Sequence, residues 1–173
     1  IEATEWSWSA LLADYDNDGW KDLFISNGYG KDITNLDFIM YGDDSNNMGL
    51  PEVTKLERQA ALNELPGIKI HNYMYRNNRD LTFEDVSESW GLSEPTFSNG
   101  TAYADLDNDG DLDLVTNNID GPATVLECKA KIEKESPKSH YLRIGFKGPE
   151  KNKEGFGTKV YLTSGSSIQY QYF

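Results

Sequence analysis

The residues best suited to chemistry are two acidic segments in which aspartates recur at a fixed spacing. The first runs from Asp14 to Asp22 and the second from Asp105 to Asp113, and both read D-x-D-x-D-G-x-x-D. With the first aspartate counted as position 1, carboxylates stand at positions 1, 3, 5 and 9 of each segment. Carboxylates this close together repel one another unless a cation gathers them. The spacing therefore predicts two cation-binding loops, called here the first loop (14–22) and the second loop (105–113).

Calcium is the ion that this pattern favours, because Ca²⁺ takes about six to eight oxygen ligands in a flexible geometry. The glycine at position 6, Gly19 or Gly110, permits the sharp turn that folds the chain around an ion. The backbone carbonyl at position 7 can add a ligand, and neither loop holds the His or Cys that would recruit zinc. The predicted ligands of two calcium ions are Asp14, Asp16, Asp18, Trp20, Asp22, Asp105, Asp107, Asp109, Asp111 and Asp113.

The flanks of the loops argue against an EF-hand. An EF-hand needs a bidentate Glu at position 12 and a helix on each side. Position 12 is Ile25 in the first loop and Thr116 in the second, and the flanking apolar runs are short and read as strands. The expected arrangement is therefore strand, acidic loop, strand.

The strands and loops belong to a repeated unit, because residues 6–27 and 97–118 align at a constant offset of 91 residues. Such a repeat predicts stacked supersecondary units. Between the two copies, residues 73–78 and 81–86 predict a β-hairpin. Its expected inward-facing side chains are Tyr75, Phe83 and Val86.

Other segments depart from the repeat. Residues 51–65 are rich in helix formers, with Pro51 at the start and Pro66-Gly67 as a stop signal, so one helix is expected within an insertion at 31–70. Residues 141–146 and 159–162 alternate as half-buried strands. The last residues also read as a strand, from which we expect the chain to be a fragment of a longer protein.

Both acidic segments resemble FG-GAP/VCBS repeats, the calcium-loop blades of integrin-type β-propellers. Residues 75–87 resemble a further segment of that family, with Arg79 and Leu81 where glycines are usual. Residues 139–173, with the run Gly-Phe-Gly-Thr-Lys-Val at 155–160, resemble the ASPIC/UnbV domain that follows such propellers in bacterial proteins.

The resemblance implies a mainly β fold, a fragment or open arc of a β-propeller with about two blades, one inserted α-helix and a C-terminal β segment. The expected units are a first blade at 1–92 carrying the insertion, a second blade at 93–130 and a partial ASPIC/UnbV-like segment at 139–173. The remaining blades of a longer parent chain are expected as packing partners.

Composition excludes several functions. The chain has 173 residues with 16 Lys and Arg against 29 Asp and Glu, a formal net charge of −13, which disfavours a nucleic-acid backbone as partner. No apolar run is long enough to insert into a membrane as a helix. Cys128 is the single cysteine and is expected to be a buried, inert thiol.

Catalysis has little support in the sequence. His71 and His140 are isolated and are interpreted as surface or structural residues and not as general bases. The tryptophans could stack on sugars, but core packing is the preferred interpretation for Trp6, Trp8, Trp20 and Trp90.

The expected function is therefore a calcium-binding, non-catalytic module for extracellular adhesion or for binding a protein or carbohydrate ligand. The expected location is outside the cell or in the cell envelope, in a bacterium as the resemblance implies, where calcium is abundant enough for weak sites. One alternative is part of a polysaccharide-active propeller enzyme whose active site lies largely outside this chain. Another is a protein-interaction scaffold that uses the insertion.

Overall fold

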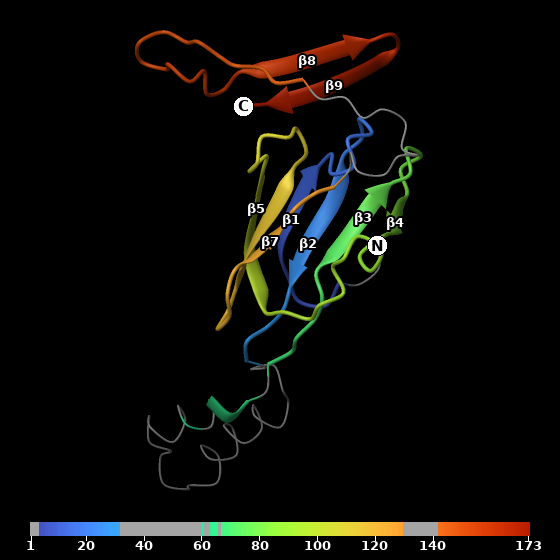
Figure 1. Cartoon of the computed structure of the whole chain (residues 1–173), viewed down its shortest axis with the longest axis vertical. Helices are drawn as coiled ribbons and strands as arrows, with labels where there is room; N and C mark the ends of the chain where they lie inside the picture. Colours follow the sequence, from blue (N-terminus) through green and yellow to red (C-terminus); the bar gives the residue numbers. More distant parts are fainter. Residues whose placement is uncertain (1–3, 32–59, 61–62, 66, 130–141) are drawn as a thin grey trace, which may run out of the picture.

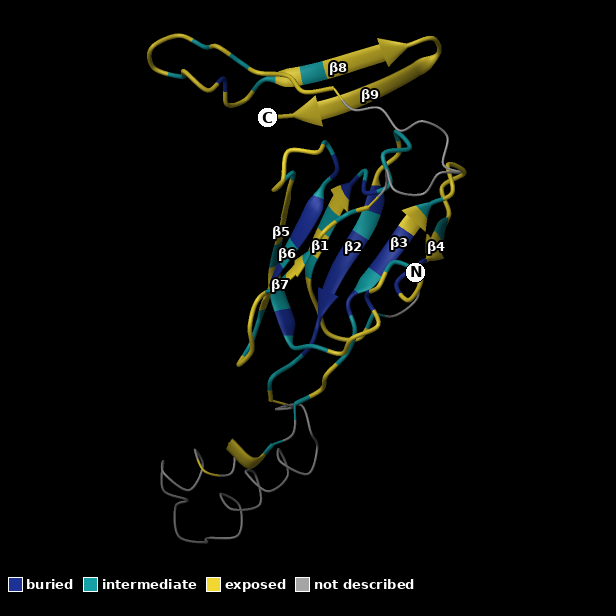
Figure 2. Cartoon of the chain, viewed as in Figure 1, coloured by how far each residue is buried: buried dark blue, intermediate teal, exposed yellow. Residues whose placement is uncertain are grey.

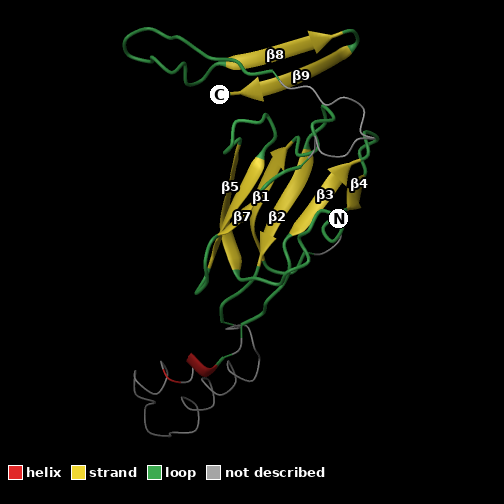
Figure 3. Ribbon diagram, viewed as in Figure 1, coloured by secondary structure: helices red, strands yellow, loops and turns green. Residues whose placement is uncertain are grey.

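The computed structural model describes residues 4–31, 60, 63–65, 67–129 and 142–173, and this part of the chain is mainly β (Figures 1 and 3). Its strands alternate along the sequence with turns and loops. They are β1 (Ser7–Ala13), β2 (Asp22–Asn27), β3 (Tyr73–Asn77), β4 (Phe83–Asp85), β5 (Ser98–Ala104), β6 (Asp113–Asn118), β7 (Thr124–Leu126), β8 (Lys159–Ser164) and β9 (Ser167–Tyr172).

The strands form three antiparallel sheets, with orders β1-β2-β3-β4, β5-β6-β7 and β8-β9. None of them closes into a barrel. The two larger sheets lie within the ranges predicted for the two blades, and the second has three strands where a full propeller blade has four. The prediction of a mainly β, unclosed fragment of a propeller-like fold is confirmed.

The internal repeat is reproduced in the backbone. β1 pairs with β2 and β5 pairs with β6, and each pair has a register irregularity near its start, between Ser7 and Ala10 and between Ser98 and Thr101. These positions are equivalent at the 91-residue offset in the sequence. The two copies therefore share strands, loops and the same bulge-like irregularity.

One apolar core joins the two larger sheets. Phe24 of β2 is fully buried and clusters with Met74 of β3 and Leu114 of β6. The buried segments of these strands are blue in Figure 2. The remaining buried members of the cluster are Ala13, Tyr15, Val86 and Leu92. Because side chains of both sheets contribute to it, the two sheets pack as one body.

Polar groups also cross the boundary between the sheets. The hydroxyls of Ser9 and Ser26 both donate to the carbonyl oxygen of Asn99, at 2.9 and 2.7 Å. The amide of Asn72 donates to the Ser98 hydroxyl at 3.1 Å. These bonds satisfy polar groups that burial would otherwise penalise.

Several local predictions are confirmed. The hairpin at 73–86 forms as β3 and β4, Tyr75 and Val86 are buried, and Phe83 is half-buried. In the turn of this hairpin, Arg79 and Leu81 have φ values of 67° and 70°, the region that favours glycine.

Other predictions are wrong. Trp6, Trp8 and Trp20 do not pack in the core and are 44%, 51% and 46% exposed. Trp6 and Trp8 lie at the edge strand β1, and Trp20 lies in the first loop. Trp90 does pack against the core, as predicted. Cys128 is half-buried, and its thiol donates to the Tyr15 carbonyl at 2.9 Å.

The tail and the insertion give a mixed outcome. Of the strand predicted at 141–146, the described residues 142–146 do not form a strand, because no described strand pairs with them, and Arg143 contacts Asp105 of the second loop. Residues 159–162 lie within β8. The predicted helix at 51–65 lies mostly outside the described residues. Within that range, the described residues Ala60, Asn63 and Glu64 have helical backbone. No helix in the described part of the chain is long and apolar enough to cross a membrane.

Candidate metal centre

The two acidic loops occupy equivalent places in the two larger sheets. The first loop connects β1 to β2, and the second connects β5 to β6. Each loop brings three carboxylates together, with one oxygen from each lying within 4.8 Å of the others. The two groups are Asp14, Asp16 and Asp18, and Asp105, Asp107 and Asp109.

The backbone of the first loop wraps around its own carboxylates. The amide of Asp18 donates to Asp14 Oδ1 at 3.0 Å and to Asp16 Oδ1 at 3.2 Å, and the amide of Gly19 donates to Asp14 Oδ2 at 2.9 Å. The glycines at position 6 make this turn possible, since Gly19 and Gly110 have φ values of 92° and 98°. The 1-3-5 spacing thus produces a curled loop in which three side chains converge.

The fourth carboxylate of each loop is placed differently. Asp22 and Asp113 are 1% and 4% exposed and lie outside the two groups. Asp22 accepts hydrogen bonds from the backbone amides of Tyr15 at 3.1 Å and Asn77 at 2.9 Å. Asp113 accepts the equivalent bonds from Leu106 at 2.9 Å and Cys128 at 3.0 Å. Each aspartate at position 9 therefore ties the start of its loop to the end of the neighbouring strand or to the segment that follows it.

Position 7 differs between the loops, although its backbone carbonyl is a predicted ligand in both. Trp20 is 46% exposed, whereas Asp111 is 1% exposed. The aspartate side chain at this position is therefore turned inward in the second loop.

Electrostatics in the first loop favour a bound cation. Burial raises the pKa of Asp14 to about 6, with further raising by Asp16 and Asp18 and partial compensation by the backbone hydrogen bonds. Burial and the charge of Asp18 likewise raise the pKa of Asp16, and burial raises the pKa of Asp22 to about 6. A raised carboxylate pKa means that the negative charges are under-compensated, which a cation would correct.

Arginines partly supply this positive charge. Arg79 Nη2 lies 2.7 Å from Asp18 Oδ2, and Arg76 Nε lies 3.7 Å from Asp16 Oδ2. In the second loop, Arg143 Nη2 lies 3.5 Å from Asp105 Oδ2. Sequence reasoning missed all three contacts. The one signal was Arg79 itself, an arginine at a usual glycine position in the predicted hairpin.

The donor set fits calcium. All the converging atoms are carboxylate oxygens, which hard cations prefer. In the second loop, Asp105 Oδ1 is buried and has no hydrogen-bond partner. Such an orphaned acceptor is costly unless a donor or a cation reaches it.

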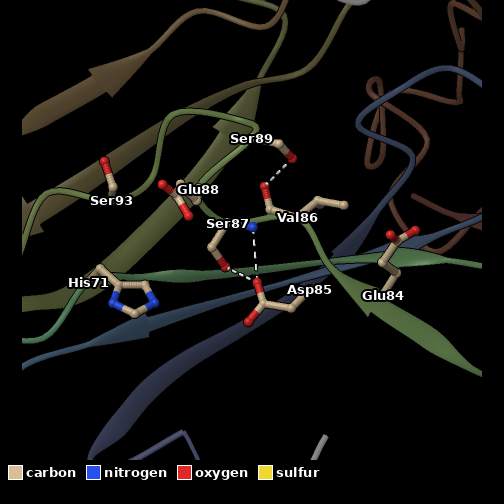
Figure 4. Close-up of a pocket in the computed structure, with 8 residues that line it drawn as sticks. All are labelled: His71, Glu84, Asp85, Val86, Ser87, Glu88, Ser89 and Ser93. Atoms are coloured by element: carbon tan, nitrogen blue, oxygen red, sulfur yellow. Dashed lines mark hydrogen bonds between the residues drawn. The ribbon is translucent and has the colours of Figure 1, made fainter.

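A separate pocket of about 780 Å³ lies beside β4 (Figure 4). Asp85 Oδ1 accepts from the amide of Ser87 at 2.9 Å and also from its hydroxyl, as the dashed lines in Figure 4 show. The ring of His71 packs against Tyr73, with the ring centroids 4.5 Å apart. The Ser87 hydroxyl is thus engaged with Asp85, whereas the His71 ring contacts Tyr73. The pocket is lined by His71, Glu84, Asp85, Val86, Ser87, Glu88, Ser89 and Ser93.

Comparisons with known proteins agree with part of this description. The family model of the FG-GAP-like repeat matches residues 59–116, a range that includes β3, β4, β5 and the whole second loop. A search of curated proteins finds no match. The family match does not extend to the tail at 139–173. Residues 59–116 are therefore similar to an FG-GAP-like repeat, the unit of integrin-like β-propeller modules.

Proposed function

We propose that this chain is a calcium-binding, non-catalytic β-propeller module that serves adhesion or ligand binding outside the cell. The observation that carries the proposal is the convergence of three carboxylates at the same place in two repeated loops. An acidic turn that occurs once is often only a turn. Two equivalent groups of converging carboxylates, one in each copy of the repeat, favour binding of the same kind of ion by both loops.

The role proposed for calcium is structural. The converging oxygens of Asp14, Asp16 and Asp18 would hold one ion, and those of Asp105, Asp107 and Asp109 the other, with backbone carbonyls at position 7 as additional ligands. When bound, the ion supplies positive charge that neutralises the carboxylates. Asp22 and Asp113 keep each loop fixed to its sheet through buried hydrogen bonds.

A protein or carbohydrate ligand is supported by the exposed aromatic residues at the edge strand β1. Trp6 and Trp8 are 44% and 51% exposed, and Trp6 stacks on Tyr29 with the ring centroids 4.7 Å apart. Exposed tryptophans provide the flat apolar surface that ligand-binding sites use. The alternative, a polysaccharide-active enzyme, places its active site outside this chain and remains a second prediction.

A calcium titration of the full chain tests the proposal. Isothermal titration calorimetry is expected to give two ions per chain, and one ion in Asp16→Ala and in Asp107→Ala, because each substitution removes a converging carboxylate from one loop. Asp80→Ala is the matched control, since Asp80 accepts from Thr82 in a turn outside both loops. Two ions in both loop variants, or none in the wild type, would contradict the proposal.

A further inference from the structure

The two loops are in direct contact. The side-chain amide of Asn17, at position 4 of the first loop, donates to Asp111 Oδ1 at 2.6 Å and more weakly to the Gly110 carbonyl at 3.4 Å. Both acceptors belong to the second loop. The contact joins residues that lie 94 positions apart in the sequence.

This contact is one step in a repeated pattern. Asn17 and Asn108 are equivalent at position 4, and both have left-handed backbone, with φ values of 56° and 64°. Asn108 also reaches out of its own loop, since its Oδ1 accepts from Arg143 Nη2 at 2.7 Å. Gln169 of β9 donates to the Gly19 carbonyl at 3.2 Å, and Figure 1 shows β8 and β9 across this end of the sheets. The position-4 asparagine thus contacts the unit that follows in the chain.

We propose that the hydrogen bond from Asn17 to Asp111 couples the two loops, so that calcium in one loop raises the affinity of the other. The inference rests on the proposed function, because it requires both loops to bind the ion. In this proposal, the side-chain amide of Asn17 positions Asp111, and the Asp111 side chain links the two loops.

The physical argument starts from the neighbours of Asn17. Asn17 lies between Asp16 and Asp18, so an ion held by those carboxylates fixes the backbone on both sides of it. Its amide then holds the Asp111 side chain, and the backbone of Asp111 supplies the predicted position-7 ligand of the second loop. Asp111 is 1% exposed and Asn17 is half-buried, so this bond is partly shielded from competing water.

Charge opposes this coupling in part, because a Ca²⁺ held in one loop weakens the negative potential that attracts an ion to the other loop. Each loop holds four carboxylates at positions 1, 3, 5 and 9, so a loop with one Ca²⁺ remains negative. The second ion therefore still meets a negative loop, and the ordering of Asp111 by the Asn17 hydrogen bond has to exceed this electrostatic cost for the coupling to be positive. Coupling between sites is reciprocal, so either loop can act as the effector.

The test measures a coupling factor by calcium titration of the full chain. The factor is the product of the two wild-type binding constants divided by the product of the single-site constants in Asp107→Ala and Asp16→Ala. We expect a wild-type factor of about 5 or more, the lower end of usual allosteric coupling. In Asn17→Gly, combined with the same loop variants, the factor should fall to about 1, the value for independent sites.

Asn108→Gly is the matched control. Both substitutions remove a position-4 side chain at a left-handed residue, where glycine is unstrained. Only Asn17 contacts the other loop, so Asn108→Gly should keep the wild-type coupling factor. In case Asn17→Gly folds poorly, Asn17→Asp also removes the amide donor, so the bond to Asp111 is lost and the factor should likewise fall to about 1.

The possible outcomes separate this inference from the proposed function. Two bound ions with a wild-type factor of 1, or a factor unchanged in both Asn17 variants, would overturn the coupling while leaving calcium binding intact. Absence of calcium binding in the wild type would overturn both. A factor lost in the Asn17 variants and kept in Asn108→Gly supports the coupling.

Discussion

Replacing Phe24 with alanine is expected to lower the free energy of unfolding by about 3–5 kcal/mol, the usual cost of deleting a buried phenylalanine side chain. Phe24 is 0% exposed and belongs to the core cluster that joins β2, β3 and β6. The substitution leaves a cavity between the two larger sheets, where the structure cannot fully collapse. Urea denaturation followed by tryptophan fluorescence measures the change.

Leu81→Ala is the control for this prediction. Leu81 is 98% exposed, so its truncation should change the free energy of unfolding by no more than about 0.5 kcal/mol. A cost at Phe24 similar to that at Leu81 would show that Phe24 is not in a shared core.

Gly28→Ala is the second substitution for which we expect a large effect, about 3 kcal/mol from combined steric overlap and backbone strain. Gly28 follows β2 and has a φ of 127°. A Cβ placed there would lie 2.4 Å from the Thr96 carbonyl oxygen, 2.6 Å from Phe97 Cα and 2.9 Å from the Ser98 amide nitrogen. All three are backbone atoms at the start of the second sheet, so the two sheets would have to move apart.

Gly91→Ala separates strain from overlap. Gly91 also has a positive φ, 84°, but a Cβ there would meet nothing within 4 Å. Its substitution should therefore cost only the strain, about 1–2 kcal/mol. Equal losses at the two glycines, measured by urea denaturation, would contradict the close approach of the sheets at Gly28.

The sequence predicted the parts of the fold that depend on short-range patterns. The acidic loops lie within nine residues each, and the strands on either side follow from short apolar runs. The hairpin of β3 and β4 was also predictable from local sequence. Such features depend only on residues that are neighbours in the sequence, so they can be predicted without knowing how the sheets pack.

Features that depend on packing were not predictable. The bond from Asn17 to Asp111 joins residues 94 positions apart and exists only because the two sheets lie side by side. The exposure of Trp6 and Trp8 depends on β1 being an edge strand. Residues 142–146 have an alternating pattern but no strand, because pairing requires a partner that the pattern does not specify.

The site was predicted in part for the same reason. Convergence of positions 1, 3 and 5 follows from local turn geometry. The separate placement of Asp22 and Asp113 follows from backbone amides that come from outside the loops, at Asn77 and Cys128. The arginine contacts with the loops likewise require the hairpin and the tail to be in place.

The central claim is that calcium held by the two loops stabilises this fold, and a thermal melt of the wild type in calcium and in EDTA tests it most directly. Calcium at about 100 times the dissociation constant should add about 2.7 kcal/mol per site. For a chain of this size each kcal/mol raises Tm by about 2–4 °C. We therefore predict a Tm several degrees higher in calcium, and a double variant, Asp16→Ala with Asp107→Ala, whose Tm is the same in calcium and in EDTA. A wild-type Tm that is unchanged by EDTA would contradict the claim.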